Sequence, residues 1–216
     1  MSNPTRGVLL IIGANMFFCV MAGLIRYVSY IDSARVALYR FMIGLGLLGL
    51  AAVFGKIKLK FSHGPFLFLR GLLGGTAVFL FYLSISKLGI GKGTVISYSF
   101  PAFSAFFGAI FLKERVTVPK ALFMAGSLYG IFLLSDDGNA ASSFTASIGR
   151  YELLAVLGAV IAGAATVVIK KLHDTDSTYA IFFAQCLVGF WLVLIPANVG
   201  GQAIGYSGGL ILVAIG

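Results

Sequence analysis

The sequence GVLLIIGANMFFCVMAGLIRY, residues 7–27, is an apolar run long enough to cross a lipid bilayer as one helix. A spanning helix needs about 20 mostly apolar residues. This run is also longer than the roughly 7–15-residue apolar core of a signal peptide. No clear small-residue cleavage site follows it, since Arg26 and Tyr27 close it. We therefore expect a retained first transmembrane helix.

Further stretches of the same kind follow along the chain. They cover residues 34–54, 65–87, 92–112, 118–135, 151–170 and 178–198, and another begins near Tyr206 and continues at Gly216. The gaps between them are short and polar, so none can hold a soluble domain. Because only helices or closed barrels satisfy the backbone inside lipid, the sequence predicts an all-α polytopic membrane protein. We expect a helix bundle of seven full helices and part of an eighth.

The overall composition agrees with this prediction. Of the 216 residues, 59% are hydrophobic and 11% are charged, whereas a soluble domain carries about 25% charged residues. The net charge of +9 would suggest nucleic-acid binding in a soluble domain. Here the basic residues lie mostly in the gaps, which favours topology signals and contacts with lipid headgroups. We expect the lipid bilayer and a small-molecule substrate as partners and no nucleic acid; a homodimer is left open.

The distribution of basic residues predicts the orientation of the chain. If the N-terminus is inside, the outer side holds a few basic residues together with Asp32, Asp136 and Asp137, and the inner gaps hold a clear basic excess. Cytoplasmic loops are normally the more basic ones. We therefore expect a bacterial inner (plasma) membrane protein with a cytoplasmic N-terminus. The basic residues of the inner gaps are Arg6, Lys56, Lys58, Lys60, Lys113, Arg115, Lys120, Lys170 and Lys171.

An internal repeat emerges when the chain is shifted by 144 residues. Leu9 and Leu10 then meet Leu153 and Leu154, and Asp32 and Ser33 meet Asp176 and Ser177. The shift crosses an odd number of helices, so the second copy is inverted, a plan common in secondary transporters. We predict a first repeat at residues 1–135, a linker at 136–150 and a partial second repeat at 151–216. By this repeat the second copy is incomplete, which predicts a fragment or a naturally short version.

The stretch from Gly93 to Leu134 resembles the end of a repeat of the EamA family, within the drug/metabolite transporter superfamily. The resemblance rests on a polar stretch, a proline, a Leu-x-Glu-Arg element and a glycine-rich helix. In this chain these are Ser97 to Ser99, Pro101, Leu112 with Glu114 and Arg115, and Gly126 with Gly130, joined by Tyr39-Arg40-Phe41 and Arg70-Gly71. The resemblance implies ten helices in two inverted five-helix repeats. It also implies a central cavity lined by helices 1, 3 and 4 and by their partners 6, 8 and 9, in a carrier of amino acids, metabolites or drugs.

Several side chains are candidates for a substrate path. Pro101 lies within the predicted helix 92–112, where it removes a backbone donor and kinks the helix, so that nearby carbonyls can face a cavity. The hydroxyl groups of Ser97, Tyr98 and Ser99 precede it at the same depth, where they either line a polar path or bond neighbouring helices. Asn15, Tyr82 and Ser84 are further path candidates.

Arg40 lies well inside the predicted helix 34–54. A central arginine costs roughly 2.5–3.5 kcal/mol on insertion scales, so it needs a partner or water. It either contacts an anion, acts as a gate, snorkels to the interface or bonds to helix-end carbonyls. Glu114 and Arg115, at the inner end of the helix 92–112, are gate candidates, although ion pairing and topology also explain them.

Other chemistries lack the residues that they require. No Asp or Glu stands at the centre of a predicted helix, which argues against proton-coupled cation exchange. His63 and His173 are far apart, so we expect no metal site and no cofactor. The run GIGKG ends in Gly93 where a phosphate loop needs Ser or Thr. With no nucleophile, base and acid in a recognisable grouping, the chain is not expected to be an enzyme. We expect a secondary carrier working by alternating access; the alternative is a non-transporting fragment or half-transporter that packs or assembles in the membrane.

Overall fold

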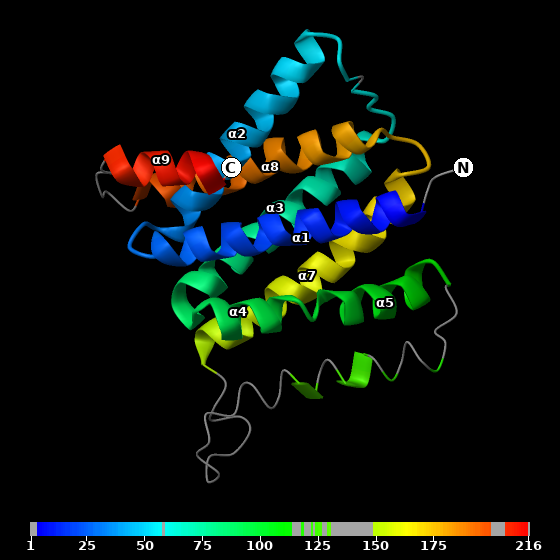
Figure 1. Ribbon diagram of the computed structural model, residues 1–216. Coiled ribbons are helices and arrows are strands. Elements are labelled where there is room, and N and C mark those ends of the chain that lie inside the picture. Colours follow the sequence, from blue (N-terminus) through cyan, green and yellow to red (C-terminus); the bar gives the residue numbers. More distant parts are fainter. Residues whose placement is uncertain are drawn as a thin grey trace.

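The computed structural model of the chain describes residues 4–57, 59–113, 118, 122, 124–126, 129–130, 149–199 and 206–215. In these ranges the regular structure is all helical (Figure 1). The helices are α1 (Pro4–Tyr27), α2 (Ser33–Val53), α3 (Gly64–Leu88), α4 (Ile90–Ser97), α5 (Phe100–Phe111), α7 (Arg150–Leu172), α8 (Thr178–Val199) and α9 (Tyr206–Ile215).

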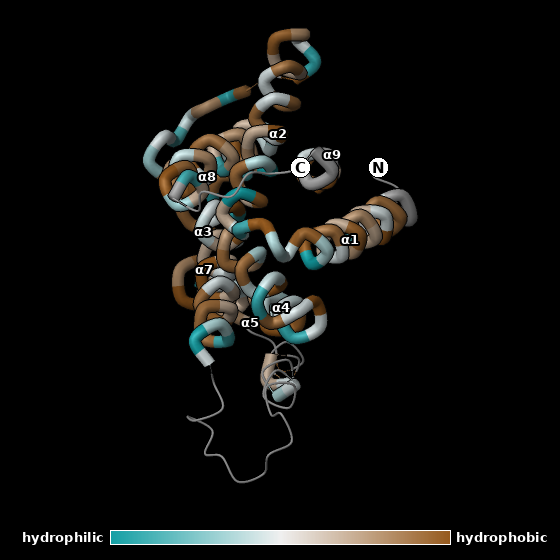
Figure 2. The backbone as a smooth tube through the Cα atoms, turned by 90° about the vertical axis from the view of Figure 1, so that its left-hand side faces the viewer, coloured by the Kyte–Doolittle hydropathy of each residue, from teal (hydrophilic) through white to brown (hydrophobic). Residues whose placement is uncertain are grey.

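The described part of the chain contains six segments that are long and apolar enough to span a membrane. These are Gly7–Tyr27, Ser33–Val53, Gly64–Leu88, Ile90–Phe111, Arg150–Leu172 and Thr178–Asn198. In Figure 2 hydrophobic colour predominates along the helices, and much of the hydrophilic colour lies at helix ends and in loops. The prediction of an all-α polytopic membrane protein is confirmed. The predicted helix at 118–135 and the linker at 136–150 lie largely outside the described residues, so the division into two repeats stays a prediction.

The predicted span at 92–112 is present as Ile90–Phe111, but the kink expected at Pro101 is a full break, because the chain forms two helices there. α4 ends at Ser97 and α5 begins at Phe100, with Pro101 in its first turn. Proline has no N–H to donate to the carbonyl four residues earlier, and its ring crowds that carbonyl. The chain instead turns tightly, with Tyr98 N donating to Thr94 O at 2.8 Å and Ser99 N to Ile96 O at 3.2 Å. The two helices still make up one membrane span.

α3 is the helix around which the others are arranged. It packs most extensively on α7 and α8, while α2 packs on α8 and α5 on α7. Glycines allow the closest approach: a Cβ on Gly75 would lie 2.7 Å from the Cα of Gly189, and one on Gly163 would lie 2.8 Å from the backbone nitrogen of Ser104. α3 thus meets α8, and α5 meets α7, almost backbone to backbone.

Contacts between helix ends and between loops show which ends of the helices share a side of the bundle. At one end, Arg26 donates to the carbonyl of Ser86 at 2.8 Å, and Lys92 pairs with Glu152 at 3.1 Å. At the other end, Asp176 accepts a hydrogen bond from the backbone N–H of Ser62. From α1 to α4–α5 the described helices therefore alternate in direction, as do α7 and α8, while α4–α5 and α7 begin at the same end of the bundle. Which of the two sides is cytoplasmic stays a prediction.

The close approach of α3 and α8 predicts opposite effects for two Gly→Ala substitutions. Gly75→Ala should lower stability by about 1–3 kcal/mol, because its Cβ has no room and the backbones must separate. Gly46→Ala should be neutral or stabilising by up to about 1 kcal/mol, because alanine favours helix more than glycine does and no atom lies within 4 Å of the new Cβ. Thermal unfolding in detergent micelles measures both, and equal effects would contradict the packing described here.

Candidate functional site

A cavity of about 730 Å³ lies between α3, α5 and α7. Its walls are mainly apolar and aromatic, with Phe66 and Leu73 from α3 and Phe107 from α5 among them. Lys170, Lys171 and Asp174 lie at the C-terminal end of α7 and in the loop that follows, and they give this end of the cavity a charged rim. The cavity therefore combines an apolar interior with polar groups at one end.

A second cavity, of about 150 Å³, lies further along the same helices. Ala77 and Phe81 of α3 line it, as do Gly158 of α7 and Phe18 of α1. On α3, positions 66, 69 and 73 of the first cavity and 77 and 81 of the second are three or four residues apart, so they share one helix face. The two cavities thus follow one another along one face of α3, and we call the two together the groove.

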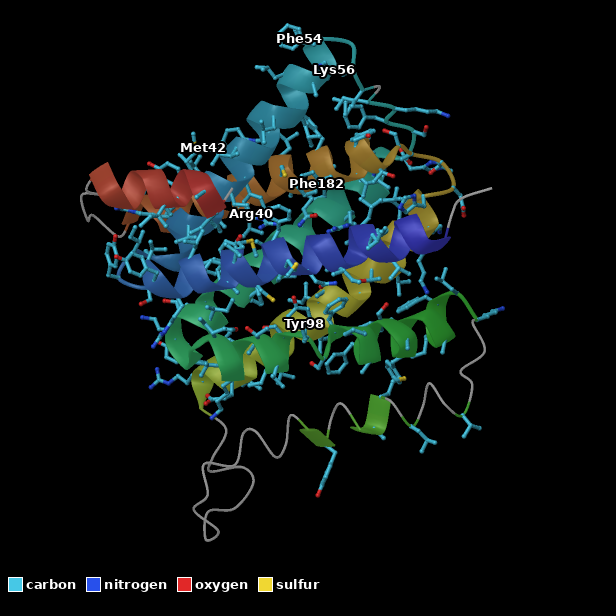
Figure 3. The ribbon with its side chains drawn as sticks, in the orientation of Figure 1. Arg40, Met42, Phe54, Lys56, Tyr98 and Phe182 are labelled. Atoms are coloured by element: carbon cyan, nitrogen blue, oxygen red, sulfur yellow. The ribbon has the colours of Figure 1, made fainter. Side chains whose placement is uncertain are left out.

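The break between α4 and α5 lies at the end of the groove farther from the charged rim, which we call the inner end of the groove. Ser97, Tyr98 and Phe100 line the smaller cavity at this break. Figure 3 shows Tyr98 at the junction of α4 and α5, next to α1, and its ring centroid lies 6.0 Å from that of Phe18. Ser99 is buried, and its hydroxyl donates to the carbonyl of Ile96 at 2.7 Å. Of the three predicted hydroxyl residues, Ser97 and Tyr98 therefore line the groove, and Ser99 bonds its own backbone.

Aromatic contacts connect Tyr98 with Arg40. The ring centroid of Phe18 lies 5.6 Å from that of Phe81, and Phe81 lies 6.0 Å from Tyr82. Arg40 Nη1 donates to the Tyr82 hydroxyl oxygen at 3.0 Å and to Met21 Sδ at 2.7 Å. This partly buried arginine of α2 thus bonds side chains of α1 and α3. Its predicted role as an anion contact or a gate stays a prediction.

The remaining candidates lie away from the walls of the two cavities. Ser84 is buried and donates to the carbonyl of Leu80 at 2.7 Å. Asn15 is exposed on α1, and Pro101 is exposed in the first turn of α5, where it separates the two helices. Glu114 and Arg115 lie outside the described residues. The sequence thus identified part of the inner end of the groove but none of the larger cavity.

The residues that sequence reasoning missed are the apolar walls of the larger cavity. Phe66, Leu73 and Phe107 belong to runs that are apolar on every face. Such runs give no contrast between a lipid-facing and a cavity-facing position. Among the described residues no group of three or more His, Cys, Asp and Glu side chains could hold a metal ion.

A buried carboxylate connects two loops beside the mouth of the groove. Asp176 accepts from Ser62 N at 2.5 Å, from His63 N at 3.4 Å and from Thr175 Oγ1 at 2.7 Å. Burial acts to raise the pKa of Asp176, but the hydrogen bonds from Ser62, Thr175 and His63 outweigh it and bring the pKa below its usual value. Since α3 begins directly after His63, this carboxylate holds the N-terminal end of α3 beside the charged rim, which is the mouth of the groove.

The lowered pKa of Asp176 predicts a loss of stability in acid. A group whose pKa is lower in the folded state stabilises the protein above its unfolded pKa, about 3.9 for Asp, and this contribution is lost as pH falls through the folded value. Asp176→Asn should lower the melting temperature at pH 7. Between about pH 5 and pH 3 the melting temperature of this variant should fall less than that of the unmodified chain. Asp174→Asn, at an exposed position of the same loop, is the control. A pH profile of melting temperature that is unchanged in Asp176→Asn would contradict this role.

The bond between Arg40 and Tyr82 predicts a cost for Tyr82→Phe. Tyr82 is buried, and removing its hydroxyl takes away an acceptor from the partly buried guanidinium of Arg40, which should destabilise the chain by about 1–3 kcal/mol. Tyr179→Phe, at a half-exposed tyrosine of α8, makes the same chemical change away from any buried arginine and should have little effect. Thermal unfolding in detergent would show the difference, and similar losses in both variants would remove the special role of Tyr82.

Comparison with known proteins adds an independent observation. Residues 5–136 match the model of the EamA-like transporter family. Solute carrier family 35 member G1 of Mus musculus is 24% identical over 226 residues, covering 99% of this chain and 61% of that protein. Pseudopaline exporter CntI of Pseudomonas aeruginosa (strain UCBPP-PA14) is 29% identical over 194 residues, covering 88% of this chain and 65% of that protein. An uncharacterized transporter of Helicobacter pylori (strain J99 / ATCC 700824) is 24% identical over 183 residues, covering 82% of this chain and 59% of that protein.

The chain thus spans less than two thirds of the length of these curated relatives. No solved structure matches it significantly. The family match runs from the start of α1 through α5 and includes Arg40, Tyr82, Ser97 and Tyr98, whereas Gly158 of the smaller cavity lies outside it. With its apolar spans, its broken helix and this match, the chain belongs to the EamA-like transporter family.

Proposed function

We propose that this chain carries small molecules across a membrane by alternating access, and that the groove between α3, α5 and α7 is part of the substrate path. The observation that supports the proposal is the course of the groove. It leads from a charged rim beside Lys170 and Lys171, along apolar walls, to the break between α4 and α5. Discontinuous helices near the middle of the bilayer form the binding sites of many secondary transporters.

The dimensions and lining of the groove suit a small organic molecule. Its larger cavity, about 730 Å³, falls within the roughly 300–1,000 Å³ typical of ligand pockets. Apolar and aromatic walls favour a carbon skeleton, while Tyr98 and Ser97 offer hydroxyl groups at the inner end. The similarity to a pseudopaline exporter supports a metabolite as the cargo.

The orientation of the groove follows from the topology. Its mouth lies at the C-terminal end of α7 and the start of α3, the side of the bundle on which α1 also begins (Figure 1). If the N-terminus is cytoplasmic in a bacterial plasma membrane, as we propose, the mouth opens to the cytoplasm. A substrate then enters from the cytoplasm and meets the broken helix before the outer side.

The sequence-based alternative, a half-transporter that assembles with another chain, differs from this proposal in its oligomeric state. In the alternative, a second copy or another subunit completes the path. Crosslinking of the chain in its native membrane distinguishes the two, because a strict monomer with transport activity is incompatible with assembly.

A plug in the groove tests the proposed path. Ala164 of α7 lines the larger cavity, and Ala164→Trp should fill it and reduce transport to the level of empty liposomes. Ala14→Trp adds the same ring at an exposed position of α1 and should leave transport unchanged. Counterflow of a radiolabelled panel of amino acids and small metabolites into proteoliposomes that contain the 216-residue chain measures the effect. Transport by Ala164→Trp at the rate of the unmodified chain would place the path elsewhere.

A further inference from the structure

Arg70 is a partly buried cation whose hydrogen bonds are incomplete. It lies in α3 at the contact with α8, where its Nη2 donates to Gln185 Oε1 at 2.7 Å. Its Nε and Nη1 atoms are enclosed and have no acceptor among the described residues. A buried donor without an acceptor loses its hydration without replacement, and a charged donor loses most.

The surroundings of Arg70 hold the guanidinium in this place. A Cβ on Gly74 would overlap Nη1 of Arg70, so the glycine makes room for the charged group. At Gly71, the residue after Arg70, a Cβ would lie 2.7 Å from the carbonyl oxygen of Ala184 on α8. Gln185 itself is only 8% exposed. α3 and α8 therefore close around Arg70 and keep water from its free N–H groups.

No carboxylate balances this charge in the described membrane spans. The acidic side chain within them is Glu152, near the start of α7, and it pairs with Lys92 at 3.1 Å. The second arginine of the interior, Arg40, also bonds neutral partners, Tyr82 and Met21. The described spans around Arg70 thus hold no carboxylate that balances its charge.

We infer that Arg70, supported by Gln185, binds an anionic group of the transported molecule, a carboxylate or a phosphate. This inference rests on the proposed carrier function and names its substrate class. Arg70 does not line the groove, so its site lies beside the groove, at the contact of α3 with α8. The contact between α3 and α8 joins the two predicted repeats, as do those of α3 with α7 and of α2 with α8, and the inference requires that it opens when the halves move apart. When α8 leaves α3, Nε and Nη1 become accessible and an anionic oxygen supplies the acceptor that they lack. Charge-assisted hydrogen bonds of this kind are among the strongest in proteins.

The first test measures anion binding directly, without transport. The purified 216-residue chain in detergent micelles is heated with succinate, inorganic phosphate or choline chloride at equal ionic strength. Succinate or phosphate should raise the melting temperature by several degrees relative to choline chloride, since a ligand that binds the folded state stabilises it. Arg70→Gln should lose this rise. Arg26→Gln, which changes an exposed arginine at the other end of the bundle, should keep it.

A second variant guards against misfolding of Arg70→Gln. Gln185→Glu places a carboxylate of nearly the same shape against Nη2 and so supplies an internal anion. It should raise the melting temperature without ligand and abolish the response to succinate and phosphate. Asn198→Asp adds a carboxylate at an exposed position of the same helix and should do neither.

Lipid headgroups carry the same phosphate chemistry, so a further arm replaces soluble anions by phosphatidylglycerol in the micelles. A rise with this lipid but not with succinate or phosphate would overturn the assignment to a transported anion. No rise in the unmodified chain, a rise that persists in Arg70→Gln, or a Gln185→Glu variant that still responds would overturn it as well. Anion binding at Arg70 without transport would leave the anion site standing but contradict the proposed function. Transport of neutral molecules without anion binding would overturn the site and leave the proposed function standing.

Discussion

The need of every backbone N–H and C=O group for a partner inside hydrocarbon governs this structure. Within a helix the requirement is met locally, so apolar runs of sufficient length become spans whatever their order of side chains. Between α4 and α5 the described chain departs from this rule in the middle of a span, because Pro101 has no N–H to give. The irregular turn between α4 and α5 lies beside α1 and the smaller cavity. Irregular backbone at membrane depth is tolerated where it is buried in protein or borders a water-filled space.

The polar side chains of the described residues divide into two groups by charge. The carboxylates of Asp32, Glu152 and Asp176 lie at helix ends, where each has a defined partner: a helix N-terminus, a lysine or the backbone of a neighbouring loop. The arginines that lie deep in the spans, Arg40 and Arg70, bond only neutral groups. The acidic groups therefore hold helix ends and loops in place, and the two arginines place positive charge within the described spans.

The sequence predicted the helices well because hydrophobic length alone determines a membrane span. It also located the disturbance around Pro101, but it could not show that the chain would divide into two helices, since proline-containing spans also bend without breaking. The partner of Arg40 could not be predicted, because Tyr82 meets it through the packing of α2 on α3. The larger cavity was missed for a related reason: Phe66 and Phe107 look the same in sequence whether they face lipid or a void. Arg70 stood out only as part of a family pattern, and its enclosure depends on α8, more than a hundred residues away in the chain.

The contacts at the two ends of the bundle have a consequence for motion. Asp176 holds the loop after α7 to the loop before α3, whereas Lys92 holds the start of α4 to the start of α7, at the opposite surface. Each contact joins residues of the first predicted half to residues of the second. Halves that rock as rigid bodies must separate at one surface while they stay together at the other. The hydrogen bonds of Asp176 and the ion pair of Glu152 would then break alternately, one in each orientation of the halves. The relative strength of the two contacts would determine the surface to which the substrate-free protein is open.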